Sequence, residues 1–349
     1  MLPNIFFSIY IAAGIYAIYK QLDEIKIIQS EYKWGKVIAK TYLVFLFIIP
    51  LLMNFSKADS RWNDLTLSYT KDAYAKTPDN ALILLSGDIP LMTANYFKYD
   101  LLKNSDNRII FTPGQFHLDW FNRQLHQRYP NLVIPPPYTG KMFTSTTQVI
   151  DANYGKWPIY VGPDLVIQDA ELEQKYVLYP KHLLFLVKRK GEDLKLEDLR
   201  DENDQIWNSI DLNKMKKISK NTPMFDESII FYYSRHFYNT GNMYEEVKLY
   251  DDAIREYKRV LEINPYFKEA LGSLGRIFGY KLDPPDFATA VSYLRNYESV
   301  LKPGEGDLWQ EAEGMISDLT QQANKEAEDQ QKRQEAEQKA ATQSAQPEQ

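Results

Sequence analysis

The sequence predicts a membrane-anchored protein in which an α/β domain is followed by an all-α array. Three observations predict this fold class. Two long apolar runs lie near the amino terminus, strand-like and helix-like segments alternate between residues 81 and 188, and helical segments recur at a fixed spacing after residue 226. A length of 349 residues leaves room for two folded domains besides the anchor.

Composition excludes several classes of function. The net charge of -6 and the absence of a basic cluster argue against nucleic acid as a partner. The chain has no cysteine, which excludes disulfides and thiol chemistry. Its 4 histidines show no metal-ligand spacing, and no phosphate-binding or nucleophile motif occurs. We therefore assign no metal, no cofactor and no catalytic residue, and leave open whether the chain is an enzyme.

Residues 1–56 are predicted to form a transmembrane hairpin. Residues 2–19 carry no charge, and as a helix they extend about 27 Å, close to the thickness of a hydrocarbon core. Residues 37–55 form the second apolar run, with Lys40 near its start. Lysines gather in the connecting loop, which places that loop in the cytoplasm. The expected location is the inner (cytoplasmic) membrane, multi-pass, with the soluble part extracytoplasmic, in a periplasm or lumen.

Residues 57–190 are predicted to form the extracytoplasmic α/β domain. Apolar strand candidates lie at 81–85, 108–112 and 158–162, and 176–188 is either a strand pair or one long bent strand, with Pro180 at the break. Because helical segments separate the strands, we expect a mostly parallel sheet, whose ligands bind beyond the carboxyl ends of the strands.

Asp88, Asp119 and Trp120 are the candidate ligand-facing residues of this domain. Asp88 follows the first strand and Gly87, so it either faces a site or caps the next helix, and a cap requires only one residue. Asp119 and Trp120 would hold a sugar by an acid and a stacking face. The alternative for Trp120, which we favour, is that it fills the interface between helix and sheet.

Five segments resemble, in their order, the extracytoplasmic end of a family of GT-C type membrane glycosyltransferases. They are ALILLSGD (81–88), NRIIF (107–111), LDWFNRQL (118–125), KWPIYVG (156–162) and QKYVLYPKHLLFLVK (174–188). The family comprises bacterial relatives of the vertebrate transmembrane protein O-mannosyltransferase. The resemblance implies sugar transfer from a lipid-phosphate donor to protein hydroxyls. It also implies a catalytic acid in an upstream loop that this chain lacks, so the chain would be accessory or inactive alone.

Residues 191–225 are charged and predicted to be a linker, and residues 226–323 show a helical repeat. The repeat resembles the tetratricopeptide motif, because small and aromatic residues recur at its spacings. Its packing residues are Phe237, Gly241, Tyr244, Ala253, Tyr257 and Pro265, with Gly275 in a second copy. Residues 324–349 are polar, have no apolar stripe and are predicted to be a disordered tail.

The repeats allow a second interpretation of function. Arrays of this kind bind partner proteins in a concave groove, so the chain would be a membrane-tethered scaffold for protein-protein interaction. Under the family resemblance the partner would be a multi-span catalytic subunit. Alternatively, so short an array only packs against the α/β domain.

Overall fold

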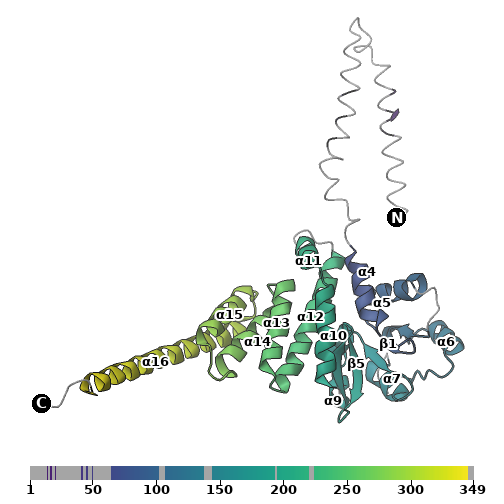
Figure 1. The fold of residues 1–349 in the computed structure, drawn as a ribbon. Helices are drawn as coiled ribbons and strands as arrows, with labels where there is room; N and C mark the ends of the chain where they lie inside the picture. Colours follow the sequence, from purple (N-terminus) through teal and green to yellow (C-terminus); the bar gives the residue numbers. More distant parts are fainter. Residues whose placement is uncertain are drawn as a thin grey trace, which may run out of the picture. The chain divides into compact units, whose positions relative to one another are not determined.

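The fold is that of a computed structural model, shown in Figure 1. It describes residues 64–101, 107–136, 144–192, 195–219 and 224–344, together with a few isolated positions before residue 64. The chain divides into two compact units, Met1–Asn63 and Asp64–Gln349. All elements named below belong to the second unit.

The predicted membrane anchor is not supported. Among the described residues, no helix is both long and apolar enough to cross a membrane. The longest two, α12 (Met224–Glu246) and α16 (Gly306–Ser344), carry charged side chains along their length. This finding contradicts the predicted transmembrane helices, multi-pass topology and inner-membrane location. The two apolar runs at 2–19 and 37–55 lie, apart from isolated positions, outside the described residues.

The described residues are mostly helical and form one small mixed sheet, which corrects the prediction of a mostly parallel sheet. The sheet has 5 strands in the order β2-β1-β3-β5-β4. β1 pairs in parallel with β2 and β3, whereas β5 runs antiparallel to both β3 and β4. The strands are β1 (Leu82–Leu84), β2 (Ile109–Phe111), β3 (Ile159–Val161), β4 (Tyr176–Lys181) and β5 (Leu184–Arg189).

The antiparallel half of the sheet arises from a tight hairpin between β4 and β5. The two residues between these strands, His182 and Leu183, both have positive φ angles, of 56° and 58°. Two such residues match the right-handed twist of the flanking strands and reverse the chain. The predicted strand pair is therefore confirmed, and the alternative of one bent strand is wrong. The predicted break at Pro180 is also wrong, because Pro180 lies within β4 and pairs with Phe185.

Both faces of the sheet are covered, because its central strands are apolar on both sides. Leu82 and Leu84 belong to the hydrophobic core on one face of the sheet. Ile83 belongs to the larger core on the opposite face. The first face packs against α6 (Asp119–Arg128), α7 (Thr146–Asn153), α8 (Pro163–Gln168) and α9 (Ala170–Lys175). The second packs against α4 (Leu65–Thr70), α5 (Asp88–Asn95), the π-helical turns η1 (Lys71–Ala75) and η2 (Tyr96–Leu101), α10 (Leu196–Ser209) and α12.

The segment predicted to be a linker is instead helical. It contains α10 and α11 (Leu212–Ser219). Leu199, Asn203 and Ile206 form the buried face of α10, three to four residues apart. Because a polar residue occupies the middle of this face and acids surround it, the helical period is hard to recognise in the sequence.

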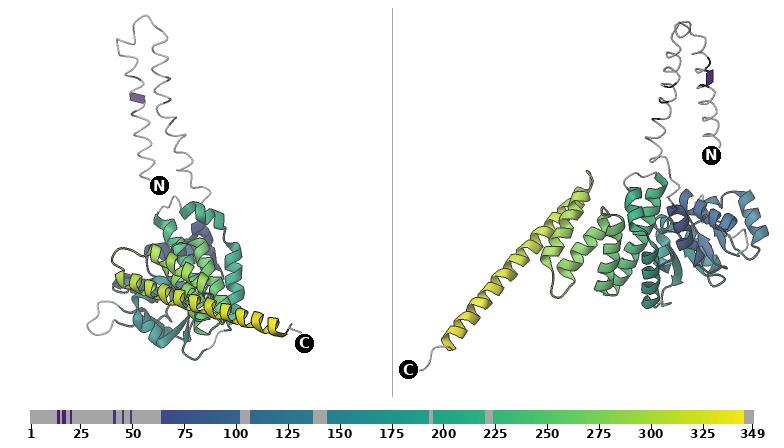
Figure 2. Two further views of the ribbon diagram at one scale, coloured as in Figure 1. Left: turned by 90° about the vertical axis from the view of Figure 1, so that its left-hand side faces the viewer. Right: turned by 45° about the horizontal axis from the view of Figure 1, so that its top comes forward.

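Helices follow one another from α12 to the end of the described chain. They are α12, α13 (Tyr250–Ile263), α14 (Lys268–Tyr280), α15 (Phe287–Val300) and α16. Figure 2 shows successive helices, green to yellow, lying side by side. The predicted disordered tail is corrected in part, since α16 continues to Ser344, with exposed side chains from 324 to 337.

Candidate functional site

An acidic residue follows each of β1 and β3 at their carboxyl ends, Asp88 after β1 and Asp164 after β3. β1 lies between β2 and β3, so the next strand in the sequence lies on one side of β1 and the one after it on the other side. Ligands of parallel sheets often bind at such a reversal of strand order. Gly87 has a φ angle of 82°, which favours glycine, and a Cβ placed on it would lie 3.4 Å from Oδ2 of Asp164. Asp88 is exposed and begins α5. It makes no side-chain cap at the start of that helix.

Asp164 is the acid that sequence reasoning missed at this edge. Its Oδ2 accepts a hydrogen bond of 2.8 Å from the Tyr232 hydroxyl of α12. Burial raises the pKa of the Asp164 carboxyl, and the Tyr232 hydrogen bond opposes the rise. The sequence did contain a signal, because Ser-Gly-Asp follows β1 and Gly-Pro-Asp follows β3.

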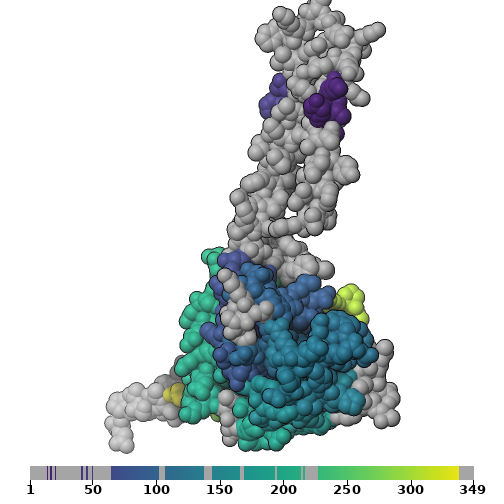
Figure 3. All heavy atoms as spheres, turned by 90° about the vertical axis from the view of Figure 1, so that its right-hand side faces the viewer, coloured from purple at the N-terminus to yellow at the C-terminus, as the bar shows by residue number. Residues whose placement is uncertain are grey.

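Asp119 and Trp120 lie elsewhere, in the first turn of α6, and both are exposed. Figure 3 views the face on which the α/β elements, blue to teal, occupy most of the surface. Trp120 is 52% exposed, so the interpretation that it fills the helix to sheet interface is wrong. It lines a pocket of about 450 Å³ with Tyr99 and Arg128, and neither Asp88 nor Asp119 lines that pocket. The structure therefore does not bring the three candidate residues into one cleft.

A second cavity lies between α12 and the edge strand β4. This groove has a volume of about 440 Å³. Tyr176, Val177, Leu178 and Pro180 of β4 contribute to its lining, as does Glu173 of α9. The opposite wall is one face of α12, formed by Arg235, Asn239, Asn242, Met243 and Glu246. These residues recur every three to four positions, as expected for one face of a helix.

Two polar side chains of α12 stand out in the α12–β4 groove. Arg235 and Asn239 are half-buried. The Arg235 guanidinium lies 5.4 Å from the centre of the Tyr238 ring. Within the described part of the chain, Arg235 forms no ion pair and the Asn239 amide forms no hydrogen bond. Because neither side chain is paired within the described chain, both are available to hydrogen-bond with a polar partner that enters the groove.

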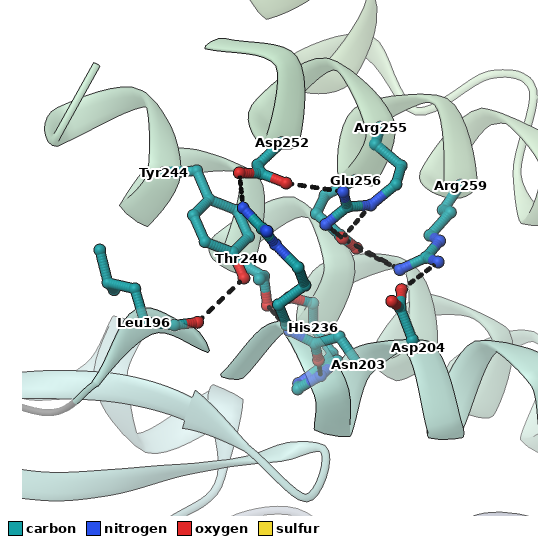
Figure 4. Close-up of polar contacts among 11 residues, drawn as sticks. Leu196, Asn203, Asp204, His236, Thr240, Tyr244, Asp252, Arg255, Glu256 and Arg259 are labelled. Atoms are coloured by element: carbon teal, nitrogen blue, oxygen red, sulfur yellow. Dashed lines mark hydrogen bonds and ion pairs between the residues drawn. The ribbon is translucent and has the colours of Figure 1, made fainter. Parts of the chain in front are cut away.

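A network of ion pairs around a buried carboxylate connects α10 to α13, beside α12, as Figure 4 shows. The Glu256 carboxylate of α13 is completely buried and accepts hydrogen bonds from both Arg255 and Arg259. Arg259 also pairs with Asp204, and Arg200 pairs with Asp252, which ties α10 to α13. Burial raises the pKa of Glu256, and the two guanidiniums beside it oppose that rise.

His236 belongs to the same region and faces α10. Its Nε2 lies 2.6 Å from Oδ1 of Asn203, whose amide group donates to the Thr240 hydroxyl at 3.4 Å. Complete burial lowers the pKa of His236 to about 4. The ring is therefore neutral at pH 7, and its role is to join α10 and α12 by a hydrogen bond.

The predicted packing residues of the helical array lie between consecutive helices. A Cβ on Gly241 would lie 2.5 Å from the ring of Tyr257, and one on Gly275 would lie 2.7 Å from Leu294. Phe237, Tyr244, Ala253 and Tyr257 are buried, whereas Pro265 is exposed between α13 and α14. The two glycines thus lie at close approaches between helices.

Neither a metal-binding cluster in the described part of the chain nor a similar known protein indicates the function. The described residues include no group of three or more His, Cys, Asp or Glu side chains arranged to hold a metal ion. No family model matches the chain, and no curated protein or solved structure matches it either.

Proposed function

We propose that this chain is a protein-interaction module and that its partner binds in the α12–β4 groove. The observation that carries the proposal is the pair Arg235 and Asn239, half-buried in a groove of about 440 Å³ and without polar partners among the described residues. A partner that supplies a carboxylate and an amide or carbonyl would satisfy both.

The helical array supports this proposal. Its helices form consecutive close-packed pairs with glycines at two of the contacts, and such arrays present long surfaces to partners. The tetratricopeptide resemblance, which stays a prediction, has the same implication. The glycosyltransferase resemblance also stays a prediction, and no described residue can be assigned to its chemistry.

Site-specific photocrosslinking tests the proposal. A benzophenone amino acid replaces Asn239 in the full-length chain, which is expressed in the organism that naturally produces it. In the control, the same amino acid replaces the exposed Gln331 on α16. We expect a discrete adduct from position 239 and none of the same mass from position 331. The Arg235→Glu change should abolish the adduct. Equal adducts from both positions, or an adduct that persists with Arg235→Glu, would reject this groove as the binding site.

A further inference from the structure

β4 has a free edge, and that edge faces the α12–β4 groove. β4 is the last strand in the sheet order and pairs only with β5 among the described strands. The β4 residues that line the groove have side chains on both faces of the sheet. Val177 points to one face, and Tyr176, Leu178 and Pro180 point to the other. Because side chains of a strand alternate between two faces, lining by both sets means that the groove runs along the edge.

The register of the hairpin shows which main-chain groups of β4 point into the groove. Tyr176 is opposite Arg189, whose N–H donates to the Tyr154 hydroxyl at 2.9 Å instead of to β4. Tyr176 and Arg189 are therefore a non-hydrogen-bonded pair. Non-hydrogen-bonded pairs alternate with hydrogen-bonded ones in an antiparallel ladder. Leu178, two residues from Tyr176, therefore forms no main-chain hydrogen bond with Val187 of β5. The N–H and C=O of Leu178 consequently point away from β5.

The edge is restricted but not closed. Pro180 has no N–H to donate, a common device that limits pairing along an edge strand. α12 stands beside the edge, but a helix has already used its own main-chain groups and cannot complete a β ladder. The Leu178 groups are therefore left to water or to an added strand, because no main-chain group of α12 can bond them.

Four charged residues line the groove, namely Glu173, Lys190, Arg235 and Glu246, and the two on α12 indicate what kind of segment fits. Arg235 and Glu246 lie on the same face of α12, eleven residues apart, which is about 16 Å along the helix. An extended segment covers that length with about five residues. In the described chain neither Arg235 nor Glu246 forms an ion pair. An acidic side chain would complement Arg235 and a basic one would complement Glu246.

We propose that the α12–β4 groove binds an extended peptide segment of a partner protein, which adds a strand to β4 by pairing with the main chain of Leu178. The segment carries an acidic and a basic residue about five positions apart, matched to Arg235 and Glu246. This inference rests on the proposed function and specifies the conformation and charge of the partner segment. Strand addition gives affinity through the main chain and specificity through side chains on alternate positions.

The test begins with a random twelve-residue peptide library displayed on phage and selected against the full-length chain. Peptides are retained only if binding is lost with Arg235→Glu and kept with Arg333→Glu, a matched control on the exposed part of α16. The retained peptides are then synthesised with a single N-methyl group at each position in turn. N-methylation removes a main-chain donor without changing the charge of the peptide.

Strand addition predicts a two-residue period in the N-methyl scan. We expect affinity to fall roughly tenfold, the size of one hydrogen bond, at alternate positions only, because the carbonyl groups of Tyr176, Leu178 and Pro180 all belong to non-hydrogen-bonded pairs of the hairpin and accept from alternate residues of an added strand. Binding should also slow hydrogen exchange at the Leu178 amide, which needs no variant of β4. An acid-to-lysine change in the peptide should restore binding to Arg235→Glu.

Other outcomes separate the inference from the proposed function. Peptides that depend on Arg235 but show no two-residue period, or leave exchange at Leu178 unchanged, overturn strand addition while the groove remains a binding site. If no selected peptide depends on Arg235, both the inference and the proposed function fail.

Discussion

The Tyr232 hydroxyl of α12 donates to Oδ2 of Asp164 across 2.8 Å, and the next residue, Tyr233, donates to Oδ2 of Asp72 across 2.7 Å. Consecutive residues of a helix point about 100° apart, so the two tyrosines reach different neighbours. One reaches α8 after β3, and the other reaches η1. Together they fix the helix that forms one wall of the α12–β4 groove against the α/β elements.

The first prediction concerns the Tyr232 hydroxyl. Its hydrogen bond lowers the pKa of Asp164 against the effect of burial, so Tyr232→Phe should raise that pKa further. We expect the free energy of unfolding to fall by about 1 kcal/mol, less than for a fully buried bond to a charge because Asp164 is only half-buried. Carboxyl NMR titration measures the pKa, and chemical denaturation measures stability.

Tyr238→Phe is the control on the same helix, since the Tyr238 hydroxyl forms no hydrogen bond within the described residues. It should leave the pKa of Asp164 unchanged and stability within about 0.5 kcal/mol. An unchanged pKa of Asp164 in Tyr232→Phe would show that this bond does not hold the carboxylate in solution.

The second prediction concerns the close approach of α12 and α13. A methyl group on Gly241 would lie 2.5 Å from the Tyr257 ring, so Gly241→Ala should lower the free energy of unfolding by about 1 to 3 kcal/mol. Gly314→Ala is the matched control, because Gly314 lies in α16 with no atom within 4 Å of its added Cβ. There alanine should stabilise by about 0.5 to 1 kcal/mol through its helix propensity. Thermal unfolding that shifts in the same direction for both variants would contradict the close contact.

The third prediction concerns the buried carboxylate of Glu256. Glu256→Ala removes the fully buried counter-charge of Arg259, which is 8% exposed, and leaves it only the more exposed Asp204, so it should destabilise by about 3 kcal/mol. Asp329→Ala removes an exposed partner of Lys332 at 3.9 Å and should cost at most about 0.5 kcal/mol. Urea denaturation compares the two. Equal costs would mean that the Glu256 network is not desolvated in the folded chain.

The sequence alone predicted those elements whose side chains are uniformly buried. Ile83 and its neighbours are continuously apolar because both faces of β1 are buried, and that pattern is visible without a structure. α10 was missed because Asn203 interrupts its buried face, bonded to His236 some 33 residues away. Whether residues 176–188 form two strands or one was left open, because His182 and Leu183 adopt positive φ without the Gly or Asn that usually marks such a turn.

The candidate groove could not be predicted for a different reason. Arg235 and Asn239 occur in the sequence as ordinary polar residues of a helix surface, and β4 lies more than 50 positions earlier. What makes them notable is that a sheet edge half-buries them without supplying polar partners. Such a relation depends on the tertiary arrangement of α12 and β4 and has no local signature.

The last prediction is a loss of stability in mild acid caused by His236. Burial lowers its pKa to about 4, whereas an unfolded histidine has a pKa of about 6.5. Between these values the unfolded chain binds more protons, so the free energy of unfolding rises with pH. The contribution is fully present above about pH 6.5, is lost as the pH falls towards 4, and amounts to roughly 3 kcal/mol. Nearby Glu202 raises the pKa of His236 and His182 lowers it, and both effects are smaller than that of burial.

The pH dependence is measured as the difference between the wild-type chain and His236→Gln, with exposed His126→Gln as control. Burial raises the pKa of Asp72, Asp164 and Glu256, so these acids favour the folded state as the pH falls and oppose the histidine effect. Because all three remain in both proteins, their contribution cancels in the difference. His236→Gln should flatten the stability profile between about pH 4 and 6.5, whereas His126→Gln should retain the wild-type slope. A wild-type slope in His236→Gln would mean that His236 is not buried as a neutral ring between α10 and α12.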